Sequence, residues 1–290
     1  MSVDFWVETA SPIKNPIKDA FLEYSKKIYE EQGYFLSSYF PSAMGGDMPV
    51  QDYLINMNED DAPENYLTMG FSECSSLKFY EKYIHSGVYN YSRIVAWFPE
   101  AMVVDLKRLG SRPVPKDYSD LCLPCYKNEV CIIGSPRIPD PLAALYIFKE
   151  KGEAAAEQFI ANIAGFGAPV NAIRHIGKSS NSFGSVFIMP LLFADICGEI
   201  KNALVVRPSD GYFAEPYVLF SKSADSRALR YINNFIESEG FIKTFEDKKF
   251  YPAISENDFR IKQICKQSYF LELKEIYPLL QEHLKIKGLP

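Results

Sequence analysis

The chain has 290 residues, 47% of them hydrophobic and 23% charged, which is the composition of an ordinary globular protein with room for two domains. Its 31 basic and 37 acidic residues give a net charge of −6, which argues against a nucleic-acid-binding surface because such surfaces are basic. No segment approaches about 18 uninterrupted apolar residues, so the sequence predicts no transmembrane helix.

The first third of the chain predicts an alternation of strands and helices. Short apolar runs indicate strands, and apolar residues three and four apart indicate amphipathic helices. Strands are predicted at Val3–Thr9, Tyr34–Tyr39 and Pro63–Gly70, and helices at Lys18–Glu31 and Leu77–His85. Strands that alternate with helices favour a parallel, doubly wound sheet.

The middle of the chain continues this pattern after Val95–Leu106, which we interpret as a first crossing between two lobes. Asp140 is a candidate helix N-cap, with Pro141 at the first helical position. Further strands are predicted at Val130–Gly134, Ser185–Met189 and Ala203–Arg207, and further helices at Gly152–Phe166 and Leu191–Cys197.

The segment Ala203–Tyr217 predicts the return crossing, because a strand is followed by the turn residues Pro208–Gly211 and then by an aromatic strand. Helices are predicted afterwards at Ser226–Glu239 and Tyr269–Lys287. The predicted fold class is therefore α/β, with two doubly wound α/β lobes and a two-strand hinge. Residues 1–97 plus 208–290 form the first predicted lobe, and residues 98–207 form the second.

Four short motifs follow one another in a recognisable order: Ser11-Pro12, the MGFS of Met69–Ser72, the PVPKDYSDL of Pro113–Leu121, and the PSDG of Pro208–Gly211. In this order the chain resembles the type II periplasmic solute-binding proteins of ABC transporters, in the branch related to ferric-iron and spermidine binders. The resemblance implies the same two-lobed fold. It also implies capture of a small ligand, an anion or a metal complex, between two closing lobes. The chain would do so as the substrate-binding component of an ABC transporter, with an ABC permease as partner, or as a cytoplasmic relative of such proteins.

Ligands of open α/β sheets bind beyond the carboxyl ends of the strands, where helix N-termini favour anions. The loops expected there carry small hydroxyl residues and two cations that could neutralise an anion. The candidate ligand-binding residues are Ser11, Gly70, Phe71, Ser72, Ser135, Arg137, Lys178, Ser179, Ser180, Asn181, Asp210 and Tyr212.

Each of these assignments has a structural alternative that the sequence leaves open. Ser11 is equally suited to cap a helix, and Arg137 to form a surface ion pair of little energetic weight. The polar run Lys178–Ser182 is also compatible with an exposed loop, and Asp210 with a role in the turn alone.

No metal site is predicted. Ferric binders of the resembled family carry adjacent tyrosines after a Gly-Glu pair, whereas Gly198-Glu199 is followed here by Ile200. Cys122 and Cys125 form a CxxC motif without the second ligand pair that structural zinc requires, so a structural role is favoured for them.

No catalytic residue and no cofactor is predicted, because the sequence lacks nucleophile-elbow, phosphate-loop and dinucleotide motifs. An enzyme on the same two-lobed fold stays the alternative, with Cys74 as its candidate nucleophile. The N-terminus lacks a signal-peptide pattern, so the expected location is cytoplasmic for the chain as written. It is periplasmic or otherwise extracytoplasmic if a leader was removed.

Overall fold

The computed structural model describes residues 3–9, 11–41, 54, 56–69, 78–134, 140–178, 184–209, 211–253, 261–262, 276, 278–280 and 282. The chain divides into two compact units. Unit 1 comprises Met1–Phe71, Ser75–Phe98 and Glu215–Asn257, and unit 2 comprises Ser72–Cys74, Pro99–Ala214 and Asp258–Pro290.

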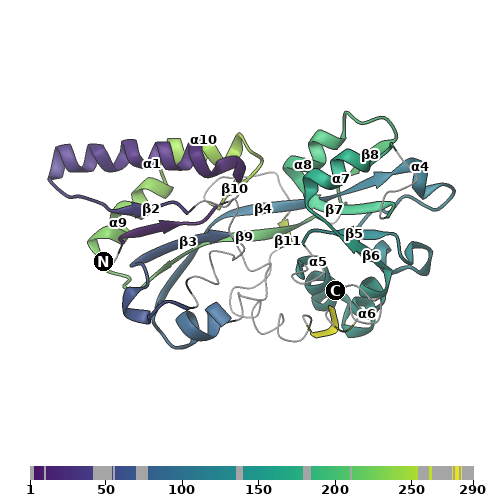
Figure 1. The fold of residues 1–290 in the computed structure, drawn as a ribbon, viewed down its shortest axis with the longest axis horizontal. Coiled ribbons are helices and arrows are strands. Elements are labelled where there is room, and N and C mark those ends of the chain that lie inside the picture. Colours follow the sequence, from purple (N-terminus) through teal and green to yellow (C-terminus); the bar gives the residue numbers. More distant parts are fainter. Residues whose placement is uncertain are drawn as a thin grey trace. The chain divides into compact units, whose positions relative to one another are not determined.

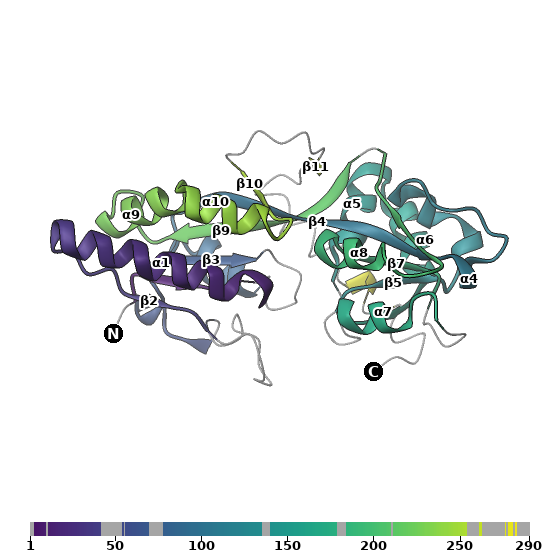
Figure 2. The ribbon, with the colours of Figure 1, turned by 90° about the horizontal axis from the view of Figure 1, so that it is seen from above.

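Unit 1 is built on a sheet in which β1 is parallel to its neighbours β2 and β3, while β9 is antiparallel to β3. Its elements are β1 (Phe5–Val7), α1 (Ser11–Gln32), β2 (Ser38–Tyr39), a 3-10 turn (Glu59–Asp61), β3 (Asn65–Met69), a π-helical turn (Tyr80–His85), α9 (Arg227–Ile236), α10 (Glu239–Glu246) and β10 (Tyr251–Pro252). Figures 1 and 2 show α1 and α10 on one face of this sheet.

The core of unit 1 is aromatic. The ring of Phe21 on α1 lies 5.0 Å from that of Phe5 on β1 and 5.1 Å from that of Phe235 on α9. Ile13 and Ile17, one turn apart on α1, are completely buried in the same core. Burial of each such side chain stabilises the folded protein by roughly 1.5–3 kcal/mol, so this packing holds α1 against the sheet.

Unit 2 has a sheet in the order β8-β4-β7-β5-β6, where β5, β6 and β7 are parallel and β4 is antiparallel to both β7 and β8. Its elements are α4 (Leu106–Leu109), 3-10 turns at Tyr118–Cys122 and Pro124–Tyr126, β5 (Val130–Ile132), α5 (Leu142–Lys151), α6 (Glu153–Asn162), β6 (Ile163–Phe166), α7 (Pro169–His175), β7 (Val186–Pro190), α8 (Leu191–Cys197), β8 (Ala203–Val206) and β11 (Ile261–Lys262). Figure 1 shows α7 and α8 on one face of the parallel strands and α5 and α6 on the other, which is the doubly wound arrangement.

Two long strands, β4 (Tyr91–Asp105) and β9 (Tyr212–Ser221), have residues in both units. The predicted crossing at Val95–Leu106 and the predicted return strand are confirmed as these elements. The turn before β9 is also confirmed, since the amide of Gly211 donates to the carbonyl of Pro208 at 3.3 Å. The predicted lobe boundaries, between residues 97 and 98 and between residues 207 and 208, stay a prediction.

Several predicted elements differ from those observed. Helix α1 begins at Ser11 rather than Lys18 and continues through Pro16, because packing of Ile13 and Ile17 outweighs the hydrogen bond that a proline removes. The helix predicted over Gly152–Phe166 is observed as α6 over Glu153–Asn162, and β6 begins at Ile163. Helices α7 and α10 were not predicted, and the final predicted helix lies largely outside the described residues.

Other local predictions are confirmed. Helix α8 has the predicted bounds, and the hydroxyl of Ser226 caps α9 by accepting from the amide of Leu229 at 3.0 Å. The carboxylate of Asp140 accepts from the amide of Leu142 at 2.8 Å, at the start of α5. Among the described residues, no helix combines the length and hydrophobicity needed to cross a membrane.

Candidate functional site

The parallel strands of unit 1 end at one edge of its sheet. Val7 pairs with Leu67 across β1 and β3, and the amide of Glu8 donates to the carbonyl of Leu67 at 2.8 Å. Glu8 and Thr9 follow β1 directly, while Thr68 lies near the end of β3. This carboxyl edge is where open α/β sheets bind their ligands.

The carboxylate of Glu8 is held in place at this edge by two hydroxyl groups of β3. The Tyr66 hydroxyl donates to Oε2 of Glu8, and the Thr68 hydroxyl donates to the same oxygen at 3.2 Å. Burial, followed by the negative charge of Glu8, raises the pKa of Tyr66 well above its usual value of 10. The phenol therefore stays protonated at physiological pH and remains a donor.

Thr9 offers a hydroxyl that the described part of the protein does not use. Its side chain is only 5% exposed, and its Oγ1 has no hydrogen-bond partner among the described residues. A buried polar group without a partner costs about 1–3 kcal/mol, so such groups are rare in native proteins.

Helix α1 begins two residues after Thr9 and has no acidic residue in its first turn. The first four backbone amides of an α-helix lack partners within the helix, and the helix dipole adds positive potential there. In α1 the second of these residues, Pro12, has no amide hydrogen, so the other three supply the donors. Thr9 and the start of α1 therefore lie together at the carboxyl edge, and both suit a polar ligand.

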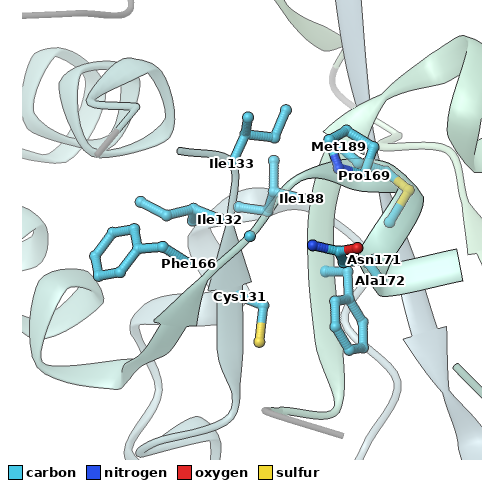
Figure 3. A pocket seen from close by; sticks show the side chains of 11 residues that line it. Cys131, Ile132, Ile133, Phe166, Pro169, Asn171, Ala172, Ile188 and Met189 are labelled. Atoms are coloured by element: carbon cyan, nitrogen blue, oxygen red, sulfur yellow. The ribbon is translucent and has the colours of Figure 1, made fainter. Parts of the chain in front are cut away.

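The carboxyl edge of unit 2 contains a pocket. Strands β6, β5 and β7 are parallel and end there, and α7 begins at Pro169, after two residues that follow the end of β6. The pocket has a volume of about 30 Å³ and is lined by Cys131, Ile132, Ile133, Phe166, Gly167, Pro169, Asn171, Ala172, Phe187, Ile188 and Met189. Figure 3 shows side chains of β5 and the end of β6 on one side of it and those of α7 and Met189 on the other.

The predicted residue Tyr212 lies in unit 2, where its hydroxyl is 3.4 Å from Nη1 of Arg207. Nη2 of Arg207 pairs with Asp195 Oδ1 at 2.9 Å. Val206 pairs with Met102, which pairs with Ile188, so Arg207 follows β8 at the level where β7 ends. Tyr212 and an arginine that the sequence did not single out therefore lie on the pocket's side of unit 2.

Lys178 lies at the opposite edge of the same sheet. It is exposed and follows Gly177, whose amide donates to Asp105 Oδ2 at 2.9 Å at the end of β4. Since β4 is antiparallel to β7, this is the edge at which β7 and β5 begin. The structure therefore does not bring Lys178 together with the carboxyl ends of these strands.

This opposite edge is stabilised by ion pairs. Glu129, just before β5, pairs with Arg108 at 3.1 Å and with Arg112 at 2.9 Å. Its carboxylate is nearly buried, while both arginines are about one-third exposed, so solvent screens part of the attraction. We interpret these charges as structural.

Most of the predicted ligand-binding residues cannot be placed. Helix α1 begins at Ser11, whose side chain lies outside the described residues. Wholly outside the described residues are Gly70, Phe71, Ser72, Ser135, Arg137, Ser179, Ser180, Asn181 and Asp210. In sequence, Ser135 directly follows Gly134 on the carboxyl side of β5.

Sequence reasoning missed Glu8, Thr9, Tyr66 and Thr68. Tyr66 and Thr68 are two apart in a predicted strand and therefore share one face, on which two hydroxyl groups of a buried strand need partners. This i, i+2 spacing of two hydroxyl-bearing residues was the signal in the sequence that could have pointed to the site. The partner itself, Glu8, could not be found because it lies 58 residues from Tyr66 along the chain.

The described residues contain no cluster of three or more His, Cys, Asp or Glu side chains that could hold a metal ion. Four cysteines are described, and all are free. Cys122 and Cys125 lie in consecutive 3-10 turns rather than at the start of a helix after a strand, so their arrangement differs from that of a thioredoxin-like redox motif.

The described cysteines should differ strongly in reactivity. Burial raises the pKa of Cys131 to about 12 and that of Cys122 to about 11, whereas Cys125 is exposed. At pH 8 only about one Cys131 side chain in 10⁴ is then a thiolate, the reactive form. We expect iodoacetamide to modify Cys125 first in the native protein, as measured by peptide mass spectrometry, and all four in urea. Equal labelling of Cys131 and Cys125 in the native state would contradict the burial of Cys131.

Comparison with known proteins gives one family match. The family model described as bacterial extracellular solute-binding protein matches residues 65–270. No curated protein matches the chain.

Solved structures match over nearly the whole length. A ferric binding protein from Campylobacter jejuni is 13% identical, with 97% of this chain and 99% of that chain covered and a TM-score of 0.66. Iron-bound HitA from Pseudomonas aeruginosa is 12% identical, with 98% and 99% covered and a TM-score of 0.64. AfuA from Actinobacillus pleuropneumoniae, solved with fructose-6-phosphate, is 14% identical, with 98% of both chains covered and a TM-score of 0.64. At these identities the likeness concerns the fold, and it confirms the predicted α/β class with two doubly wound units.

Proposed function

The chain belongs to the family of bacterial extracellular solute-binding proteins, and from this membership we propose that it captures a small polar solute as the substrate-binding component of an ABC transporter. Two compact units joined by two strands suit a protein that closes on its solute. Of the two locations that the sequence left open, an extracellular family favours the extracytoplasmic one.

The observation that carries this proposal is the unused hydroxyl of Thr9 at the carboxyl edge of unit 1. A buried hydroxyl without a partner lowers stability, and a ligand at this edge that completed its hydrogen bonds would offset that cost. The adjacent start of α1 supplies backbone amides for an anionic group, and Arg207, which pairs with Asp195, lies at the carboxyl edge of unit 2. These features support an anion or a metal complex as the solute.

The enzyme alternative rested on Cys74, which lies outside the described residues. The family is one of transport proteins, and this favours binding without turnover. A thermal-shift panel of metals, oxyanions, polyamines, sugars and carboxylates tests the proposal. A true solute at about 100 times its Kd adds roughly 2.7 kcal/mol to the stability. No shift with any class on the panel would contradict the proposed function.

Thr9→Val is expected to separate stability from binding. Valine keeps the shape of threonine and removes the unpartnered hydroxyl, so the ligand-free protein should gain about 1 kcal/mol in free energy of unfolding. The solute found by the panel should bind roughly 10-fold more weakly, because one hydrogen bond is lost. Urea unfolding and calorimetric titration measure the two quantities.

Ser185→Ala is the matched control for Thr9→Val. Ser185 also carries a buried hydroxyl without a partner among the described residues, but it lies directly before β7, at the opposite edge of unit 2. This variant should leave the affinity unchanged. A Thr9→Val protein that binds as tightly as the parent would exclude Thr9 from the site.

A further inference from the structure

The pocket at the carboxyl edge of unit 2 has a chemical character of its own. We propose that it is an apolar subsite that receives a small uncharged group of the solute, such as a short alkyl branch. The pocket itself is a property of unit 2, whereas its use by a transported solute rests on the proposed function. The solute would then be amphiphilic, with a polar part and a small apolar part.

Among the residues that the structure describes, the lining carries no charged side chain. Ten of the eleven lining residues are apolar residues, glycine or cysteine, and Asn171 supplies the one amide. Burial keeps the Cys131 thiol neutral, because it raises the pKa of this group to about 12. A charged or strongly polar group would lose its hydration here without gaining partners, so the pocket selects against it.

Water is also poorly held in this pocket. A buried water needs two to four polar partners, and the described lining offers few. Ile188 and Met189 of β7 and Ile132 of β5 are at least 96% buried, so the walls are fixed by the core behind them. A preformed, poorly hydrated apolar pocket of this kind favours the binding of apolar groups.

The size of the pocket limits its occupant. A volume of about 30 Å³ exceeds the roughly 10–15 Å³ that one water molecule needs, so there is room for a group of a few heavy atoms. It lies among the carboxyl-terminal residues of β5, β6 and β7 and against α7, near the edge at which ligands of such sheets bind. Location, lining and size therefore agree on a small apolar group.

Xenon tests the pocket directly, because it is apolar and forms no hydrogen bonds. The probe is xenon gas dissolved over protein labelled at isoleucine and methionine methyl groups, observed by NMR. We expect the methyl signals of Ile132, Ile188 and Met189 to shift in the parent protein. If these signals stay in place while xenon is present, the pocket is not an apolar subsite and the proposal is overturned, whatever the solute panel shows.

Two leucine variants sharpen the test. Ala172→Leu places a side chain into the pocket and should abolish the xenon shifts, whereas Ala161→Leu, on the exposed end of α6, should preserve them. Far-UV circular dichroism checks that both fold. Shifts that persist in Ala172→Leu would place xenon elsewhere and overturn the proposal.

Straight-chain carboxylates from acetate to hexanoate extend the test to solutes. Affinity should rise about 4-fold for each of the first two or three methylene groups in the parent and in Ala161→Leu, and stay flat in Ala172→Leu. An equal rise in all three proteins would overturn the subsite. Xenon shifts together with a panel that finds no polar solute would support the pocket and count against the proposed transport function alone.

Discussion

Phe213→Ala is expected to lower the free energy of unfolding by about 3–5 kcal/mol. The ring of Phe213 stacks on the rings of two tyrosines with nearly parallel planes. Its centroid lies 3.5 Å from the ring centroid of Tyr118 and 4.2 Å from that of Tyr146. Phe213 is 1% exposed, so the substitution loses the free energy of burying the ring and also leaves a cavity.

The substitution removes a contact that holds the two long strands, β4 and β9, in place within unit 2. The Tyr118 hydroxyl donates to the carbonyl of Glu100 on β4, and its ring stacks on Phe213 of β9. Tyr118 therefore contacts both strands close to the point where each passes to unit 1. Without Phe213, this connection loses its aromatic partner.

Urea unfolding followed by far-UV circular dichroism measures the effect. Both tryptophans, Trp6 and Trp97, lie in unit 1, so tryptophan fluorescence reports unit 1 while circular dichroism reports both units. Phe35→Ala is the control, because this side chain is 73% exposed and its removal should change the stability by less than about 0.5 kcal/mol. A Phe213→Ala protein within 1 kcal/mol of the parent would refute the stacked arrangement.

Gly184→Ala is the second substitution for which we expect a large effect, a loss of about 3 kcal/mol or more. A Cβ atom at this position would lie 2.3 Å from the carbonyl oxygen of Glu129 and 2.9 Å from Sγ of Cys131. The carbonyl cannot withdraw cheaply, because it accepts hydrogen bonds from the amides of Ser185 and Val186. Relief of the overlap would break this junction between β5 and β7.

Gly240→Ala provides the matched control. Gly240 lies in helix α10, and the nearest atom to an added Cβ is the Ser238 hydroxyl at 4.0 Å. Alanine should therefore stabilise the protein here by about 0.5–1 kcal/mol, through its higher helix propensity. Thermal unfolding of the two variants should shift in opposite directions, and a Gly184→Ala protein as stable as the parent would contradict the close packing.

The elements that the sequence predicted well are those with local causes. Helix α9 follows from its apolar stripe and the Ser226 cap, and the turn before β9 follows from Pro208 and Gly211. The start of α1 and the end of α6 were missed for the opposite reason. At both places tertiary packing decides between local alternatives, as it does when Ile13 and Ile17 carry α1 through Pro16.

The sequence predicted where in the fold the candidate site lies, but not which residues form it. The rule that ligands lie beyond the carboxyl ends of strands pointed to the loops after β1 and β5, and Thr9 and the pocket lie at such edges. It could not rank the residues within the loops. Lys178 illustrates this, because its position at the opposite edge depends on the direction of β7 relative to β4.

By itself the sequence determined the α/β class, the crossing strands and the resemblance to solute-binding proteins, because periodicity, turn residues and motif order are read along the chain. Only the tertiary structure decided which polar groups meet. Glu8 accepts from Tyr66 and Thr68, 58 and 60 residues away, and the hydroxyl of Thr9 next to it has no partner among the described residues. Hydrogen bonds and pockets depend on distances between atoms remote in sequence, and these distances exist only once the sheets have formed.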